Sequence, residues 1–163
     1  MRVWQGRPKF TPDEKTRMLE WQKAEAHYFG LLGLRLVDLE PGYCKLELPF
    51  KREISHGRGV VQGGILTTLA DSCIAHATIA ALAGEDRHTT TIELKINFIR
   101  PATPSLFTAE AWLIHLGNRT AVGEAEITNE EGKLIAKCLS SLMVLPGGRR
   151  PVAVEGDGPS TQT

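Results

Sequence analysis

One carboxylate stands alone within a long apolar stretch, QGGILTTLADSCIAHATIAAL, which runs from Gln62 to Leu82. Asp71 is the only formally charged residue between Arg58 and Glu85. A stretch that is apolar on nearly every side predicts a helix buried in a core. A buried carboxylate is kept when it is paired, protonated or used in chemistry, so Asp71 is the first candidate for a general base or a carboxylate nucleophile. The competing interpretation is structural: Asp71 would bond a nearby backbone or hydroxyl group, or lie on an exposed stripe of the helix.

Composition narrows the classes of partner. With 163 residues, the chain suits one domain with a substantial core. The formal net charge is zero, which argues against a nucleic-acid or membrane partner and favours a small molecule or another protein. The three cysteines are odd in number and lack metal-ligand spacing, so we expect them to be reduced core residues. The N-terminal sequence MRVWQGRPKF carries charges where an export signal needs apolar residues, and a cytoplasmic protein is expected.

The elements that must position Asp71 follow from caps and periodicity. Thr11, Pro12 and Glu14 give an N-cap, a first-turn proline and a capping box, so a helix is predicted from 11 to about 29. Alternation of apolar and polar residues predicts the strands. These strands span 34–40, 43–49, 90–100, 106–116, 120–128 and 133–145, and the apolar stretch at 62–82 is a helix between the second and third.

The strand order and short connections define the expected architecture. Turns at 41–42, 117–118 and 129–132 are of hairpin length, which predicts antiparallel pairing. A curved antiparallel sheet of about six strands, wrapped around the long helix, would bury that helix. We therefore predict an α+β fold with an extra N-terminal helix. Residues 1–10 are expected to be a flexible N-terminus, 11–145 a single domain, and 146–163 a flexible tail.

Three segments resemble a known family. They are HGRGVVQGGILTTLADS, TTIELKINFIRPA and GNRTAVGEAEITNEEGKLIA. These segments resemble the hotdog-fold acyl-CoA thioesterases of the PaaI-like type, within the 4-hydroxybenzoyl-CoA thioesterase superfamily. The resemblance covers about 34–145. It implies a hotdog fold, hydrolysis of an acyl-CoA thioester, and subunits joined edge to edge as a homodimer that is often paired again into a homotetramer.

The resemblance also assigns positions in the site. The family motif has an Asn, then a His followed by two glycines, and then an acid nine residues after that His. This sequence has His56, Gln62, Gly63-Gly64 and Asp71 at the same spacings. His56 and Gln62 therefore replace the usual Asn and His, which alters the donors beside the reacting carbonyl. The glycine pair and the acid are kept.

The chemistry of these residues fits thioester hydrolysis. Asp71 supplies a base or nucleophile, while the N–H of Gly63 at the first turn of the helix supplies an oxyanion donor. A family Ser or Thr that helps to hold the water falls near Thr91, with Thr90 as the alternative. Gly63 and Asp71 are eight residues apart, about 12 Å along a helix, which is too far for one reacting group. We therefore predict a site at a dimer interface, with Gly63, Gln62 and His56 from one subunit and Asp71 and Thr91 from the other.

The substrate contacts are less specific. Gly64 lets the thioester approach, and Leu66, with Leu69 and Ile74, is expected beside the acyl chain. Arg100, Arg119 and Lys137 are candidates for the coenzyme A phosphates. No metal or organic cofactor is implied, since coenzyme A belongs to the substrate.

Two alternative functions stay open at this point. One is a hotdog hydratase or dehydratase, in which His56 would pair with the helix acid. The other is a module that binds acyl-CoA without turnover. The acyl group and the choice between dimer and tetramer are not set by the sequence.

Overall fold

The computed structural model describes residues 9–25 and 27–147. Its helices are α1 (Pro12–Glu25), α2 (His27–Leu32) and α3 (Gly63–Ala81), with a short 3-10 turn, η1 (Arg52–Ile54). Its strands are β1 (Arg35–Glu40), β2 (Tyr43–Pro49), β3 (Arg87–Phe98), β4 (Leu106–Leu116), β5 (Thr120–Thr128) and β6 (Leu134–Pro146). The predicted flexible ends at 1–8 and 148–163 lie outside the described residues.

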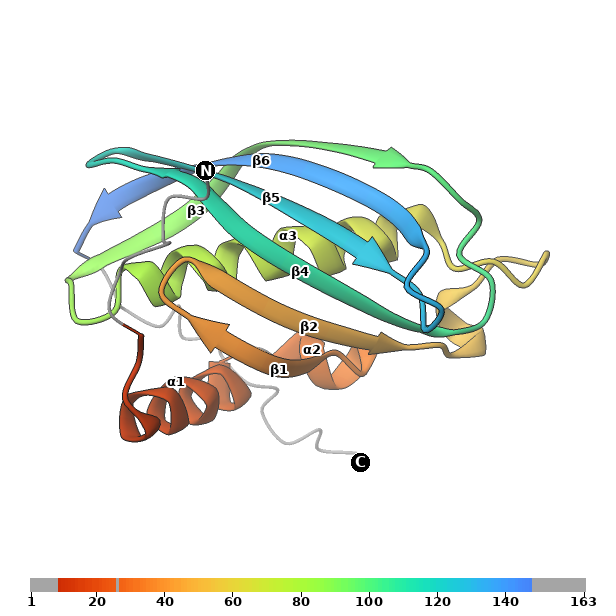
Figure 1. The fold of residues 1–163 in the computed structure, drawn as a ribbon, viewed down its shortest axis with the longest axis horizontal. Coiled ribbons are helices and arrows are strands. Elements are labelled where there is room, and N and C mark those ends of the chain that lie inside the picture. Colours follow the sequence, from red (N-terminus) through yellow and green to blue (C-terminus); the bar gives the residue numbers. More distant parts are fainter. Residues whose placement is uncertain (1–8, 26, 148–163) are drawn as a thin grey trace, which may run out of the picture.

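The six strands form one antiparallel sheet in the order β1-β2-β4-β5-β6-β3. Figure 1 shows this sheet curving along α3, with α1 and α2 beside the β1 edge. The fold class is therefore confirmed, as a hotdog fold in which a sheet encloses a long helix. Inward residues alternate with outward residues along β2, β4 and β5, because successive side chains of a strand point to opposite faces.

The N-terminal helical region starts as predicted and extends further than predicted. The backbone N–H of Thr11 donates to Glu14 Oε2 (2.8 Å), and the N–H of Glu14 donates to Thr11 Oγ1 (3.3 Å), which forms the expected capping box. The predicted end at about Phe29 was wrong, because α2 continues to Leu32 and Gly30 lies inside it. Gly33, at φ +76°, follows α2 in a conformation that favours glycine.

The start of the described chain contacts the sheet. The N–H of Phe10 donates to Glu40 Oε2 (3.0 Å), and Lys15 forms ion pairs with both Asp38 and Glu40. These contacts attach the start of α1 to β1.

The helix α3 is the core helix, but the sheet encloses only part of it. Its residues Leu69, Ala70 and Cys73 are fully buried, while Gln62 at its N-cap is exposed. The 19 residues of α3 are long and apolar enough to cross a membrane, yet they pack inside the sheet as a core helix does. Asp71 is half-buried. The prediction of burial all round was therefore wrong, because a single sheet covers one side of the helix and leaves a stripe partly open.

The edge strand β3 carries a bulge. Thr91 pairs with Leu142 and Glu93 pairs with Ser141, so Ile92 is an extra residue. The bulge turns Thr91 to the same inner face as Leu94, one position out of strict alternation. Strict alternation would place Ile92 on the inner face with Leu94, whereas Ile92 is 53% exposed.

The free edge strand β3 is long and carries exposed apolar side chains among polar ones. Ile92 and Phe98 on β3 are each 53% exposed, and Ile99, directly after it, is 46% exposed. An edge strand offers unpaired N–H and C=O groups to another chain.

Candidate functional site

Asp71 lies in a cavity of about 480 Å³ between α2, α3 and β3. Its lining residues are Tyr28, Thr67, Thr68, Asp71, Ser72, Thr91 and Leu94. We call this space the Asp71 cavity. Thr91 Oγ1 donates to Asp71 Oδ1 (2.8 Å). This bond engages one carboxylate oxygen, so Thr91, rather than Thr90, contacts the acid.

Each hydroxyl group that lines the Asp71 cavity donates its proton in a hydrogen bond. Thr67, Thr68 and Ser72 each donate to the helix carbonyl four residues earlier, at 3.0, 3.0 and 2.6 Å. Thr91 donates to Asp71. Tyr28 Oη lies 3.0 Å from Ser72 Oγ, and since a hydroxyl has one proton, Ser72 must accept this bond. The polar side chains of this cavity therefore present acceptors only.

A cavity that lacks side-chain donors has a chemical limit. It can hold a water molecule through the water's two protons and direct the oxygen lone pairs outward. The negative oxygen of a tetrahedral intermediate needs donors, which these side chains do not offer in this arrangement. A donor for such an oxygen would have to come from outside this cavity.

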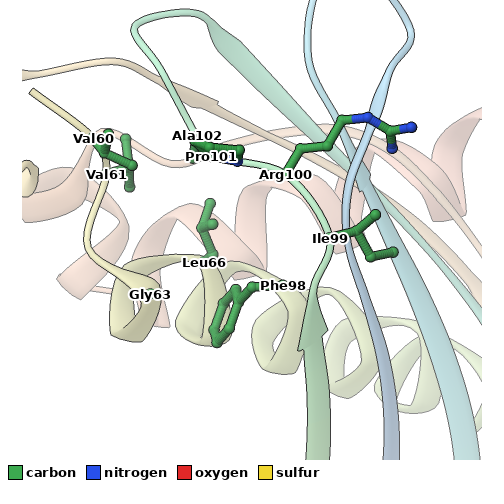
Figure 2. Close-up of a pocket in the computed structure, with 9 residues that line it drawn as sticks. All are labelled: Val60, Val61, Gly63, Leu66, Phe98, Ile99, Arg100, Pro101 and Ala102. Atoms are coloured by element: carbon green, nitrogen blue, oxygen red, sulfur yellow. The ribbon is translucent and has the colours of Figure 1, made fainter.

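Gly63 lies in a second cavity, of about 300 Å³, at the start of α3 (Figure 2). Its walls come from the segment before the helix, from Leu66, and from the end of β3 with the loop that follows; the lining residues are Val60, Val61, Gly63, Leu66, Phe98, Ile99, Arg100, Pro101 and Ala102. We call this space the Gly63 cavity. Gly63 and Gly64 begin α3, so their N–H groups have no carbonyl four residues back in the helix. The positive end of the helix dipole lies here as well.

The lack of a side chain at Gly63 keeps this cavity open beside Phe98. A Cβ atom at Gly63 would lie 3.1 Å from Phe98 Cζ, whereas one at Gly64 would meet nothing within 4 Å. Phe98 lies on the inner face of β3, as its alternation with Leu94 and Ile96 predicts. The aromatic ring and Leu66 give the cavity an apolar wall.

His56 and Gln62 line neither cavity. His56 is exposed, and its Nδ1 accepts from the N–H of Arg58 (3.2 Å) within a turn that Gly59, at φ +72°, closes. Gln62 is exposed at the N-cap of α3, where its side chain makes no capping bond. Both side chains are therefore outside the two cavities of one chain, next to the residues that form the Gly63 cavity.

The expected acyl contacts are partly corrected. Leu66 lines the Gly63 cavity. Leu69 and Ile74, by contrast, are fully buried and line neither of the two cavities, because they point into the sheet. Ile74 packs closely against Gly123, where a Cβ would lie 2.6 Å from Ile74 Cγ2.

The basic candidates for coenzyme A differ in their surroundings. Arg100 lines the Gly63 cavity, but its Nη1 donates to the Leu134 carbonyl (2.6 Å) and its side chain points away from Gly63 in Figure 2. Arg119 is exposed in the β4–β5 turn, at the end of the sheet opposite the start of α3 (Figure 1). Lys137 pairs with Glu126 (2.8 Å) and Glu124 (3.3 Å). Only Arg100 is therefore close to a cavity.

Five residues that line the Asp71 cavity were not predicted as site residues: Tyr28, Thr67, Thr68, Ser72 and Leu94. Tyr28 is the one that comes from α2, outside α3 and the sheet. No local sequence pattern distinguishes it, because the packing of α2 on α3 brings it there. Among residues 9–25 and 27–147, no group of three or more His, Cys, Asp or Glu is placed to hold a metal ion.

Comparison with known proteins agrees with this fold. The model of the thioesterase superfamily matches residues 58–136. "Putative esterase SSO2140" of Saccharolobus solfataricus is 33% identical over 72% of this chain and 82% of its own length. The acyl-coenzyme A thioesterase PaaI of Escherichia coli is 29% identical over 71% of this chain and 84% of its own.

Solved structures agree as well. A thioesterase family protein from Silicibacter pomeroyi superposes with a TM-score of 0.74 at 28% identity, covering 81% of this chain and 98% of the other. The fold and the two cavities thus define a hotdog-fold protein of the thioesterase type. The chain belongs to the thioesterase superfamily, and the resemblance noted in its sequence is confirmed.

Proposed function

We propose that this protein hydrolyses an acyl-coenzyme A thioester to a free acid and coenzyme A, at a site that two subunits complete together. The observation that carries this proposal is the separation of functions between the two cavities. The Asp71 cavity offers a carboxylate and acceptors, whereas the Gly63 cavity offers backbone N–H donors at a helix start. Thioester hydrolysis requires both on one carbonyl group.

The second subunit is expected to bring the two halves together. In one chain, Gly63 and Asp71 are two turns apart on the same straight helix, about 12 Å along its axis. The free edge of β3, where Ile92 and Phe98 are exposed, supplies a surface for a partner, and Thr91 on that strand already holds Asp71. A homodimer joined at β3 would place the Gly63 cavity of one subunit against the Asp71 cavity of the other. We propose this homodimer as the catalytic unit, with two dimers paired into a tetramer.

The proposed reaction uses these groups in sequence. Asp71 Oδ2 takes a proton from a water molecule, and the water oxygen bonds to the thioester carbonyl carbon. The Gly63 N–H of the other subunit stabilises the negative oxygen that forms. The carbon–sulfur bond then breaks, the electron pair leaves with sulfur, and the proton held by Asp71 passes to the thiolate. No metal or organic cofactor takes part in this scheme.

The alternative role for Asp71 is that of a nucleophile that forms an anhydride with the acyl group. Single turnover in water labelled with oxygen-18 can identify the nucleophile. A general base leaves the label only in the product acid. Label in the Asp71 side chain, which peptide mass spectrometry detects, requires an anhydride that water hydrolyses at the Asp71 carbonyl.

The activity is tested by thiol release across a panel of acyl-coenzyme A esters, with wild type, Asp71→Asn and the control Asp13→Asn. Asp13 is exposed in the first turn of α1, away from both cavities. We expect wild type and the control to release thiol, and Asp71→Asn to lose at least about 100-fold in turnover while it remains dimeric. Conversion of an enoyl ester without thiol release would instead identify a hydratase, and tight binding without turnover would identify a binding module.

A further inference from the structure

Tyr28 stands apart from the other residues of the Asp71 cavity because it comes from the N-terminal helix α2. Its ring packs edge to face on Phe29, with centroids 5.0 Å apart and planes at 80°. Phe29 is itself buried and lies 5.2 Å from the His76 ring on α3. Tyr28 is thus held against α3 in two ways. Its ring packs on Phe29, which contacts His76, and its hydroxyl group bonds to Ser72.

The direction of the Tyr28–Ser72 bond can be deduced. Ser72 Oγ lies 2.6 Å from the Thr68 carbonyl oxygen, and two oxygens approach this closely only with a hydrogen between them. The single Ser72 proton is therefore used, so Tyr28 donates to Ser72. Burial is the main cause of a raised pKa for Tyr28, and the nearby charge of Asp71 raises that pKa further, so the phenol keeps its proton at neutral pH. The Tyr28 oxygen then offers only its lone pairs to the cavity.

We propose that Tyr28 is a positioning residue for the attacking water: its oxygen accepts one proton of the water while Asp71 Oδ2 accepts the other. This inference rests on the proposed thioester hydrolysis. A water held through both of its protons has its lone pairs directed away from both acceptors, toward a carbonyl carbon that enters from the donor side. The hydroxyl oxygens of Thr67 and Thr68 belong to the same helix as Asp71, and that of Thr91 is bonded to Asp71 Oδ1 itself. Tyr28 approaches from α2, on another side of the cavity, and supplies the second direction that a bent water molecule requires.

Methanol provides a chemical test of this contact. Methanol has one hydroxyl proton, so it can donate to Asp71 but not to Tyr28 as well. Water can donate to both. Loss of the Tyr28 oxygen should therefore slow attack by water without slowing attack by methanol. A general disturbance of the cavity would slow both reactions together.

The experiment compares wild type, Tyr28→Phe and Tyr43→Phe in a methanol–water mixture, with one acyl-coenzyme A ester that wild type hydrolyses. Tyr28→Phe keeps the ring on Phe29 and removes only the oxygen. Tyr43→Phe is the matched control, because Tyr43 also donates through its hydroxyl, to Glu110 (2.6 Å), but on the outer face of the sheet. Free acid, methyl ester and thiol are measured, together with kcat and KM.

We expect Tyr28→Phe to lower kcat for hydrolysis on the order of 3- to 10-fold, the worth of one neutral hydrogen bond, at unchanged KM. The ratio of methyl ester to free acid should rise by the same factor, and the control should match wild type. A wild-type kcat for Tyr28→Phe would overturn the proposal. So would a lower kcat at an unchanged product ratio, since Tyr28 would then be only structural. Failure of wild type to release thiol from any ester would refute the thioesterase function itself, which is a different result.

Discussion

Two substitutions at Gly63 isolate the proposed oxyanion donor. Gly63→Ala adds a Cβ and keeps the backbone N–H, whereas Gly63→Pro adds a similar Cβ and removes the N–H. Proline fits this position, because Gly63 is the first residue of α3 and proline is favoured there. The residue before a proline must be extended, and Gln62 already is, at φ −62° and ψ 133°.

The structure sets the size of each effect. The added Cβ in both variants would lie 3.1 Å from Phe98 Cζ, so the ring must shift by a few tenths of an ångström. Phe98 is 53% exposed and has room to do so. Replacing a helical glycine by alanine gains about 0.5–1 kcal/mol, which offsets this shift. We therefore expect both variants to melt within a few degrees of wild type, while Gly63→Pro turns over about 10²- to 10³-fold more slowly than Gly63→Ala.

Thiol release at saturating acyl-coenzyme A gives the ratio of the two variants directly, and calorimetry with size-exclusion chromatography checks folding and assembly. Because the Cβ is common to both, its steric effect on the substrate cancels in this ratio, which leaves the N–H and the rest of the proline ring as the difference. Equal turnover of Gly63→Ala and Gly63→Pro would refute the assignment of the Gly63 N–H as the donor.

Three further predictions concern the surroundings of Asp71 and the stability of the core. Thr91→Val keeps the shape of the side chain but removes the donor to Asp71 Oδ1, so kcat should fall on the order of 10-fold; an unchanged kcat would mean that this bond does not orient the acid. Burial lowers the pKa of His76 below its ordinary value of 6.5, against the opposing effect of its bond to the Ser72 carbonyl. The unfolded state then binds more protons than the folded state as pH falls below about 6.5, so the free energy of unfolding should decrease with falling pH there. In urea titrations, His76→Leu should flatten this slope by up to about 1.4 kcal/mol per pH unit. An identical slope in wild type and His76→Leu would contradict this. Gly30→Ala, inside α2 with open space around its Cβ, should raise stability by about 0.5–1 kcal/mol without changing activity.

Much of the fold could be predicted because local patterns and packing agree. The alternation in β2, β4 and β5 gave strand bounds close to those observed, and the capping box at Thr11 gave the start of α1. The end of the N-terminal helical region was missed, because Gly30 has a helical conformation here and the left-handed turn comes at Gly33.

The errors around Asp71 have two physical causes. The apolar sequence of α3 predicts that the helix is buried, but it does not say which surfaces cover it. The partly open stripe of α3 was therefore not foreseen. The bulge at Ile92 leaves no local signal either, since it depends on how β3 pairs with β6. Family spacing led to Thr91, which the bulge turns toward the acid. Alternation alone would have placed it on the outer face.

The position of Tyr28 and the two cavities can be known only from the three-dimensional structure. The side chains of the Asp71 cavity offer only acceptors because five hydroxyl groups use their protons in hydrogen bonds at the observed distances. None of these bonds can be deduced from residue types alone.

Subunit complementation tests the shared site most directly. Asp71→Asn and Gly63→Pro subunits, each with a different affinity tag, are co-expressed, and the mixed dimer is purified. Both homodimers should be nearly inactive, whereas the mixed dimer should recover about half of the wild-type rate, because one of its two sites has Gly63 from one subunit and Asp71 from the other. An inactive mixed dimer, with both subunits folded and associated, would contradict a site built from two chains.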